Sequence, residues 1–68
     1  MIYHPEFVAK NIRLLPMYRG KSGLSQDALA QKLHMHPTLL GRYERRISLP
    51  LQANYNKLAR YFGWEVWE

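Results

Sequence analysis

The sequence predicts an all-α domain of four helices that covers residues 1–68. Two observations lead there: apolar residues recur at helical spacing, and glycine and proline fall mostly between the helical segments. The absence of cysteine excludes disulfide scaffolds, thiol catalysis and cysteine-rich zinc sites. With 68 residues, of which 47% are hydrophobic, the chain can bury one core but not two. A core of this size stabilises a fold only modestly, so a partner subunit is also expected.

The first helical segment is expected over residues 6–19. Pro16 interrupts it, because proline lacks the N–H that would bond the carbonyl of Ile12 and its ring crowds the preceding turn. A kinked helix and two short helices meeting near Leu15 are both consistent with this pattern. Gly20 is expected to cap the segment. The apolar face comprises Phe7, Val8, Ile12, Leu15 and Tyr18.

The second helix is expected over residues 26–33. Ser25 is a favoured N-cap residue, and Asp27 places a negative charge in the first turn, where the helix dipole stabilises it. The apolar stripe that would face the core comprises Leu24, Ala28, Leu29, Leu33 and Met35.

The third helix follows a short break at residues 34–36. Pro37 suits its first position, where the missing N–H costs nothing, and residues 38–45 continue it. Leu40 and Tyr43 are three residues apart and would both face the core.

A loop over residues 46–50 ends at a proline, and the fourth helix is expected over residues 52–62. Gly63 closes that helix. Its inward face comprises Tyr55, Leu58, Ala59 and Phe62.

The C-terminal tail, residues 64–68, alternates apolar and polar side chains and permits two interpretations. It forms a short strand that pairs with a second chain through Trp64, Val66 and Trp67. Alternatively, Trp64 closes the end of the core while the last residues fray.

Basic residues dominate the central part of the chain. The net charge is +5, and Glu44 is the only acid between residues 28 and 64. This balance favours an anionic partner, although an ordinary basic protein with a solvated charged face has the same composition. The basic residues of this region are Lys32, Arg42, Arg45, Arg46, Lys57 and Arg60.

Two short helices joined by a turn of about three residues describe a helix-turn-helix, here over residues 24–43. A set of residues in and around this motif forms a recognisable pattern: Gly23-Leu24-Ser25-Gln26, Leu29-Ala30, Leu33, Leu40, Tyr43-Glu44-Arg45, Pro50 and Leu58-Ala59. With these residues the sequence resembles the Cro/C1-type (XRE) helix-turn-helix transcriptional regulators over about residues 15–64. That resemblance implies a lambda-repressor-like fold of four helices that binds double-stranded DNA.

The resemblance assigns base reading to Pro37, Thr38 and Arg42. A guanidinium can donate two hydrogen bonds to guanine, so Arg42 is the first candidate. Thr38 would contact a thymine methyl group or a phosphate, and Pro37 offers apolar contact only.

The resemblance also implies a set of phosphate contacts and a structural ion pair between Arg19 and Glu44. Exposed N–H groups at a helix start attract phosphate, although Ser25 is also simply a helix cap. The phosphate candidates are Ser25, Gln26, His36, Arg45 and Arg46.

Four positions depart from the family's pattern. His34 stands where a small residue or glycine is usual, so a left-handed backbone conformation there would be strained. His36 stands where a serine-like cap is common, Arg46 replaces a frequent glycine, and Pro16 breaks a first helix that is normally continuous. His34 and His36 lack a neighbouring cysteine or carboxylate, so we expect turn residues and no metal site.

No catalytic residue, cofactor or small-molecule ligand is expected, because neither Ser25 nor Ser48 has a base at a readable spacing. No apolar run approaches the ~20 residues that cross a bilayer, and residues 1–6 do not resemble a signal peptide. A cytoplasmic protein that is not an enzyme is expected.

The sequence therefore predicts a transcriptional repressor that binds a near-palindromic operator as a homodimer. The alternative is an antitoxin-like or other protein-interaction module, in which the tail docks a partner such as a toxin or another regulator.

Overall fold

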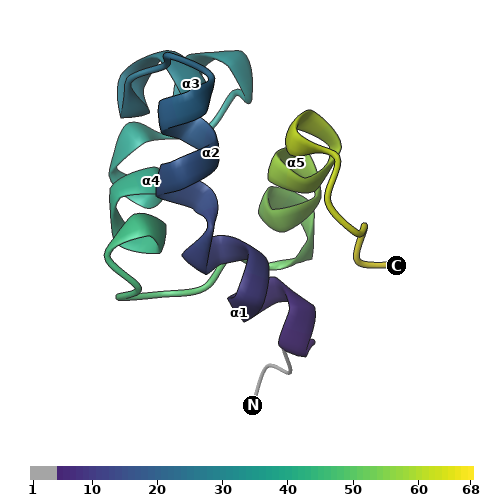
Figure 1. Cartoon of the computed structure of the whole chain (residues 1–68). Coiled ribbons are helices and arrows are strands. Elements are labelled where there is room, and N and C mark those ends of the chain that lie inside the picture. The colour runs from purple at the N-terminus through teal and green to yellow at the C-terminus, as the bar shows by residue number, and fades with distance from the viewer. Residues whose placement is uncertain (1–4) are drawn as a thin grey trace.

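The computed structural model of the chain describes residues 5–68, which form five α-helices and no strand (Figure 1). The all-α class is confirmed. None of the described helices is long and apolar enough to span a membrane. Residues 1–4, which belong to the segment compared with a signal peptide, lie outside the described residues. The helices are α1 (Glu6–Arg13), α2 (Leu15–Lys21), α3 (Gln26–Lys32), α4 (Pro37–Glu44) and α5 (Gln52–Phe62).

The first segment is two helices, which is one of the two outcomes that Pro16 allowed. Leu14 is both the C-cap residue of α1 and the N-cap residue of α2. Gly20 does not cap α2 as expected, because it lies inside that helix. Gly23 instead takes the left-handed conformation, with φ +70°, and its N–H bonds the carbonyl of Gly20. The helix therefore runs to Lys21, two residues further than the expected end at residue 19.

Four of the helices end in the same kind of turn. In each, one residue adopts positive φ, and the N–H of the next residue bonds a carbonyl five positions back. These bonds satisfy carbonyls that the helix end would leave without partners. The four residues are Gly23, His34 (φ 53°), Arg46 (φ 60°) and Gly63.

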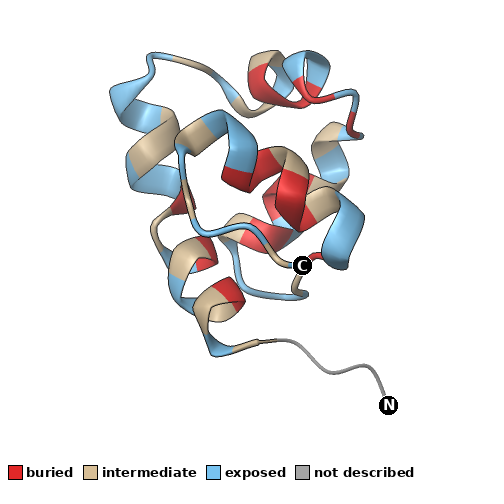
Figure 2. Cartoon of the chain, turned by 90° about the vertical axis from the view of Figure 1, so that its right-hand side faces the viewer, coloured by how far each residue is buried: buried red, intermediate tan, exposed pale blue. Residues whose placement is uncertain are grey.

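Each of the five described helices contributes at least one buried residue to a single core cluster, and α2 contributes only Leu15. Figure 2 colours the buried residues red. Helices α3 and α4 pack against each other most extensively, and α1 lies against both α2 and α4. The expected inward positions Leu40, Tyr43 and Leu58 are all buried. The whole cluster comprises Val8, Ile12, Leu15, Leu29, Ala30, Leu33, Met35, Leu40, Tyr43, Tyr55, Leu58 and Ala59.

In the single chain the C-terminal tail is not a strand, and its pairing with a second chain stays a prediction. The side chain of Asn56 holds the backbone of Trp67 through two bonds of 2.8 Å, one to its N–H and one to its carbonyl. Gln52 donates a further bond of 2.9 Å to the same carbonyl, and the Tyr55 hydroxyl donates to the carbonyl of Glu65. Side chains of α5 thus occupy backbone groups that a partner strand would need.

Trp64 closes the end of the core, as the second alternative had it. Its ring lies edge-on to Tyr18, with centroids 5.5 Å apart, and stacks on Phe62 at 5.2 Å. Trp67 also packs against the core, edge-on to Tyr55 at 6.5 Å. The tail is therefore an ordered strap along α5, and its last residues do not simply fray (Figure 1).

Candidate nucleic-acid interface

Helix α4 presents one exposed side to solvent. Leu40 and Tyr43 are buried, whereas Thr38 and Arg42 are exposed and lie four residues apart on the same side of the helix. An α-helix with its side chains is about 10–12 Å across, which matches the width of about 12 Å of the major groove of B-DNA. The helix can therefore enter that groove with Thr38 and Arg42 facing the bases.

The start of α4 is capped by His36. Its Nδ1 accepts a hydrogen bond of 3.1 Å from the backbone N–H of Thr38. Because Nδ1 is the acceptor, the ring proton of the neutral side chain is on Nε2. Nε2 is then a donor on an exposed side chain, beside Pro37 in the first position of the helix. This end of α4 can both cap itself and donate a hydrogen bond to an anion.

The other end of α4 is held by an ion pair between Arg19 of α2 and Glu44. Nε of Arg19 donates to Oε2 at 2.5 Å, and Nη2 donates to Oε1 at 3.0 Å. A third donor, Nη1, bonds the carbonyl of Leu24 at 2.9 Å, just before α3. One guanidinium therefore fixes the relative positions of α2, α3 and α4.

Gln26, the first residue of α3, joins the same network. Its Nε2 donates to Oε1 of Glu44 at 2.9 Å, so the start of α3 lies beside the end of α4. Burial would raise the pKa of the Glu44 carboxyl, but the hydrogen bonds from Arg19 and Gln26 and the charge of Arg19 more than offset it, and the pKa is lowered. Glu44 is therefore an ionised, enclosed carboxylate with a side chain 8% exposed, and it repels a phosphate only weakly.

Gly41 lies beside this network, on the side of α4 that faces α3. A Cβ at Gly41 would lie 3.5 Å from Oε1 of Gln26 and 4.0 Å from both terminal nitrogens of Arg45. The Arg45 guanidinium therefore lies over Gly41, close to Gln26, and the residue is exposed. Arg46, also exposed, follows in the left-handed turn.

Ser25 caps α3 by accepting the N–H of Ala28 at 3.0 Å. The cap leaves its hydroxyl proton free to donate to an anion.

The predicted contact residues thus fall into two end groups and a middle. His36 lies at the start of α4, and Ser25, Gln26 and Arg45 gather around its end, while Arg42 lies on the exposed side between them. Phosphate donors that flank base-reading side chains match the arrangement of two backbones on either side of a groove.

Sequence reasoning missed the bond between Gln26 and Glu44, because Gln26 was assigned only to phosphate.

A family model described as helix-turn-helix matches residues 17–65 of the chain. No curated protein and no solved structure matches the chain.

Proposed function

The chain belongs to the Cro/C1-type (XRE) family of helix-turn-helix DNA-binding regulators, and from this premise we propose that it represses transcription as a homodimer on a near-palindromic operator. Two α4 helices would reach successive major grooves, roughly 34 Å apart on one side of the duplex. Repression follows from occupancy of the operator, which would exclude polymerase from the same DNA.

One observation supports the choice of α4 as the reading helix above the others. Among the described helices, α4 alone combines the exposed polar side chains of Thr38 and Arg42 with hydrogen-bond donors for an anion at both of its ends. In this proposal the Arg42 guanidinium donates to O6 and N7 of a guanine, and Thr38 contacts a thymine methyl group or a phosphate. Pro37 contributes apolar contact only.

The phosphate contacts are proposed for the two end groups. Nε2 of His36 serves one strand, while Ser25 and the Arg45 and Arg46 side chains serve the other. The Gln26 side chain is bonded to Glu44, so its contribution is the exposed N–H at the start of α3. Arg19 and Glu44 hold these groups in place without touching DNA.

Replacing Arg42 with alanine tests the proposal. Arg42→Ala should weaken binding to a selected operator duplex by about tenfold to a hundredfold, as loss of a bidentate base contact does. Binding to random duplex should weaken much less. Arg13→Ala is the matched control, because Arg13 is an exposed arginine on α1 and its loss removes the same charge.

The measurement is fluorescence anisotropy on both duplexes over a series of salt concentrations. Phosphate contacts make the affinity fall with salt, and each lost contact reduces the slope by about one. If Arg42→Ala and Arg13→Ala weaken both duplexes equally, Arg42 does not read a base and the assignment fails.

A further inference from the structure

A shallow pocket of about 400 Å³ lies between the C-terminal end of α3 and the second half of α5. A hydrogen bond of 3.1 Å from Nζ of Lys57 on α5 to the carbonyl of His34 joins the two sides of this pocket. None of its residues has a part in the proposed DNA contacts. They are Lys32, Leu33, His34, Lys57, Arg60 and Tyr61.

The pocket carries three positive charges that no carboxylate balances. Glu44 is the only acid between residues 28 and 64, and it is engaged by Arg19 and Gln26. In the described part of the chain, Lys32, Lys57 and Arg60 form no ion pair. Like charges around one concavity repel each other, and a ligand with several negative charges relieves that repulsion.

The pocket also offers apolar surface. Tyr61 is 43% exposed, and its ring lies edge-on to Phe62, with centroids 5.0 Å apart, which limits its movement. Leu33 forms part of the wall. Partly exposed tyrosines bordered by cations are typical of protein interfaces, whereas a phosphate group alone has no apolar atoms to place against such a ring.

The core lies between this pocket and the exposed side of α4. Leu40 of α4 and Leu58 of α5 are both buried in the core, so the exposed sides of the two helices point away from each other. Figure 1 shows α4 and α5 on opposite sides of the molecule. A ligand in the pocket would therefore leave α4 free to hold DNA.

We propose that this pocket binds an acidic segment of a partner protein. Carboxylates of that segment pair with Lys32, Lys57 and Arg60, and an apolar side chain between them lies against Tyr61. The domain would then carry a second interface that is independent of DNA reading.

The probe is a short synthetic peptide with one tryptophan flanked on both sides by aspartates, titrated into the intact, isotope-labelled chain. Backbone amide signals of residues 32–34 and 57–61 should shift, and those of residues 38–42 should not. A peptide with asparagines in place of the aspartates should bind at least about tenfold more weakly. Shifts spread over every basic surface would overturn the proposal.

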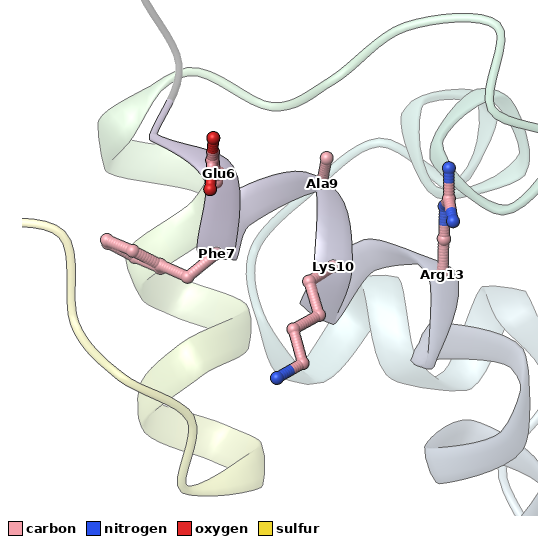
Figure 3. Close-up of a pocket in the computed structure, with 5 residues that line it drawn as sticks. All are labelled: Glu6, Phe7, Ala9, Lys10 and Arg13. Carbon is pink, nitrogen blue, oxygen red and sulfur yellow. The ribbon is translucent and has the colours of Figure 1, made fainter.

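The double variant Lys32→Gln/Arg60→Gln should weaken binding of the acidic peptide by about tenfold. Both side chains are exposed, so the fold should be unaffected. The matched control is Lys10→Gln/Arg13→Gln on α1, where the two cations border another shallow pocket beside Phe7 and Glu6 (Figure 3). Equal losses in the two double variants would indicate unspecific charge attraction and sink the proposal.

Two further measurements test the apolar contact at Tyr61 and ask whether the pocket also binds DNA. Tyr61→Ala should weaken the peptide severalfold, and an unchanged affinity contradicts the apolar contact. Lys32→Gln/Arg60→Gln should leave binding to random duplex DNA within about twofold of the parent. If DNA binding falls instead, the pocket belongs to the DNA surface. Arg42→Ala affects only DNA binding, so the two proposals fail independently.

Discussion

Single side chains decide how the ends of α4 are held. Arg19 is the clearest case, since its one guanidinium bonds Glu44 twice and the carbonyl of Leu24 once. Mutual hydrogen bonding raises the pKa of Arg19, while that of Glu44 is lowered. The ion pair is therefore fully charged at neutral pH and stabilises the folded state.

Replacing Glu44 with glutamine should lower the free energy of unfolding at pH 7 by about 2 to 4 kcal/mol, because Arg19 loses its counter-charge. A carboxyl whose pKa is lower in the folded state contributes its full stability above the unfolded value. The contribution is lost as pH falls through the lowered folded value. Urea unfolding of parent and Glu44→Gln should therefore differ most at neutral pH and converge below the ordinary value of 4.5.

The control for that series is Glu65→Gln, which removes an exposed carboxylate from the tail. It should change stability by less than about 0.5 kcal/mol at any of these pH values. A difference for Glu44→Gln that does not vary with pH would mean that the ion pair does not stabilise the fold through its charge.

At the scale of elements, the strap formed by the tail is the main departure from expectation. Asn56 is buried at 8% exposure, and both the nitrogen and the oxygen of its amide group bond the backbone of Trp67. The strap covers the aromatic end of the core, where Trp64 meets Tyr18 and Phe62. Its position along α5 thus depends on polar side chains rather than on strand pairing.

Asn56→Ala should release the strap and lower the free energy of unfolding by about 1 to 3 kcal/mol, since it leaves the N–H of Trp67 without its acceptor. Tryptophan fluorescence should move to longer wavelength as Trp67 becomes hydrated. Gln52→Ala is the milder comparison, because it removes one exposed hydrogen bond to the same residue. Equal effects of the two substitutions would contradict the dominant role of Asn56.

Most helix starts and ends could be predicted from the sequence, because they depend on the chemistry of neighbouring residues. Ser25 and Pro37 mark helix starts directly, and the start and end of α5 match the expectation at residues 52 and 62. The strap could not be predicted in the same way, because Asn56 and Trp67 meet only after α5 has packed. The bond between Gln26 and Glu44 likewise depends on how α3 lies against α4.

At the scale of the whole molecule, the small core favours association with a second copy of the chain. The tail was expected to supply that contact, but Trp64 and Trp67 pack against their own core. Val66 is the tail's exposed apolar side chain, at 36%. Ile47, in the loop before α5, is 65% exposed.

If the tail mediates dimerisation, Val66→Asp should weaken self-association by at least about tenfold, because it buries a charge at the interface. Sedimentation equilibrium measures the change. Met17→Asp is the matched control, since Met17 is an exposed apolar residue on α2. Dissociation by Ile47→Asp, with Val66→Asp still dimeric, would assign the contact to the loop and exclude the tail.

The left-handed turns that end four helices offer positions where a substitution should raise the thermal stability of the fold. Two of these turns, at His34 and Arg46, lie on either side of α4 and use residues with a side chain where glycine is unstrained. Glycine at each should add about 1 kcal/mol to the free energy of unfolding, measurable as a higher melting temperature. At residue 46 the gain would come at the expense of a proposed phosphate contact, whereas at residue 34 DNA affinity should be unchanged.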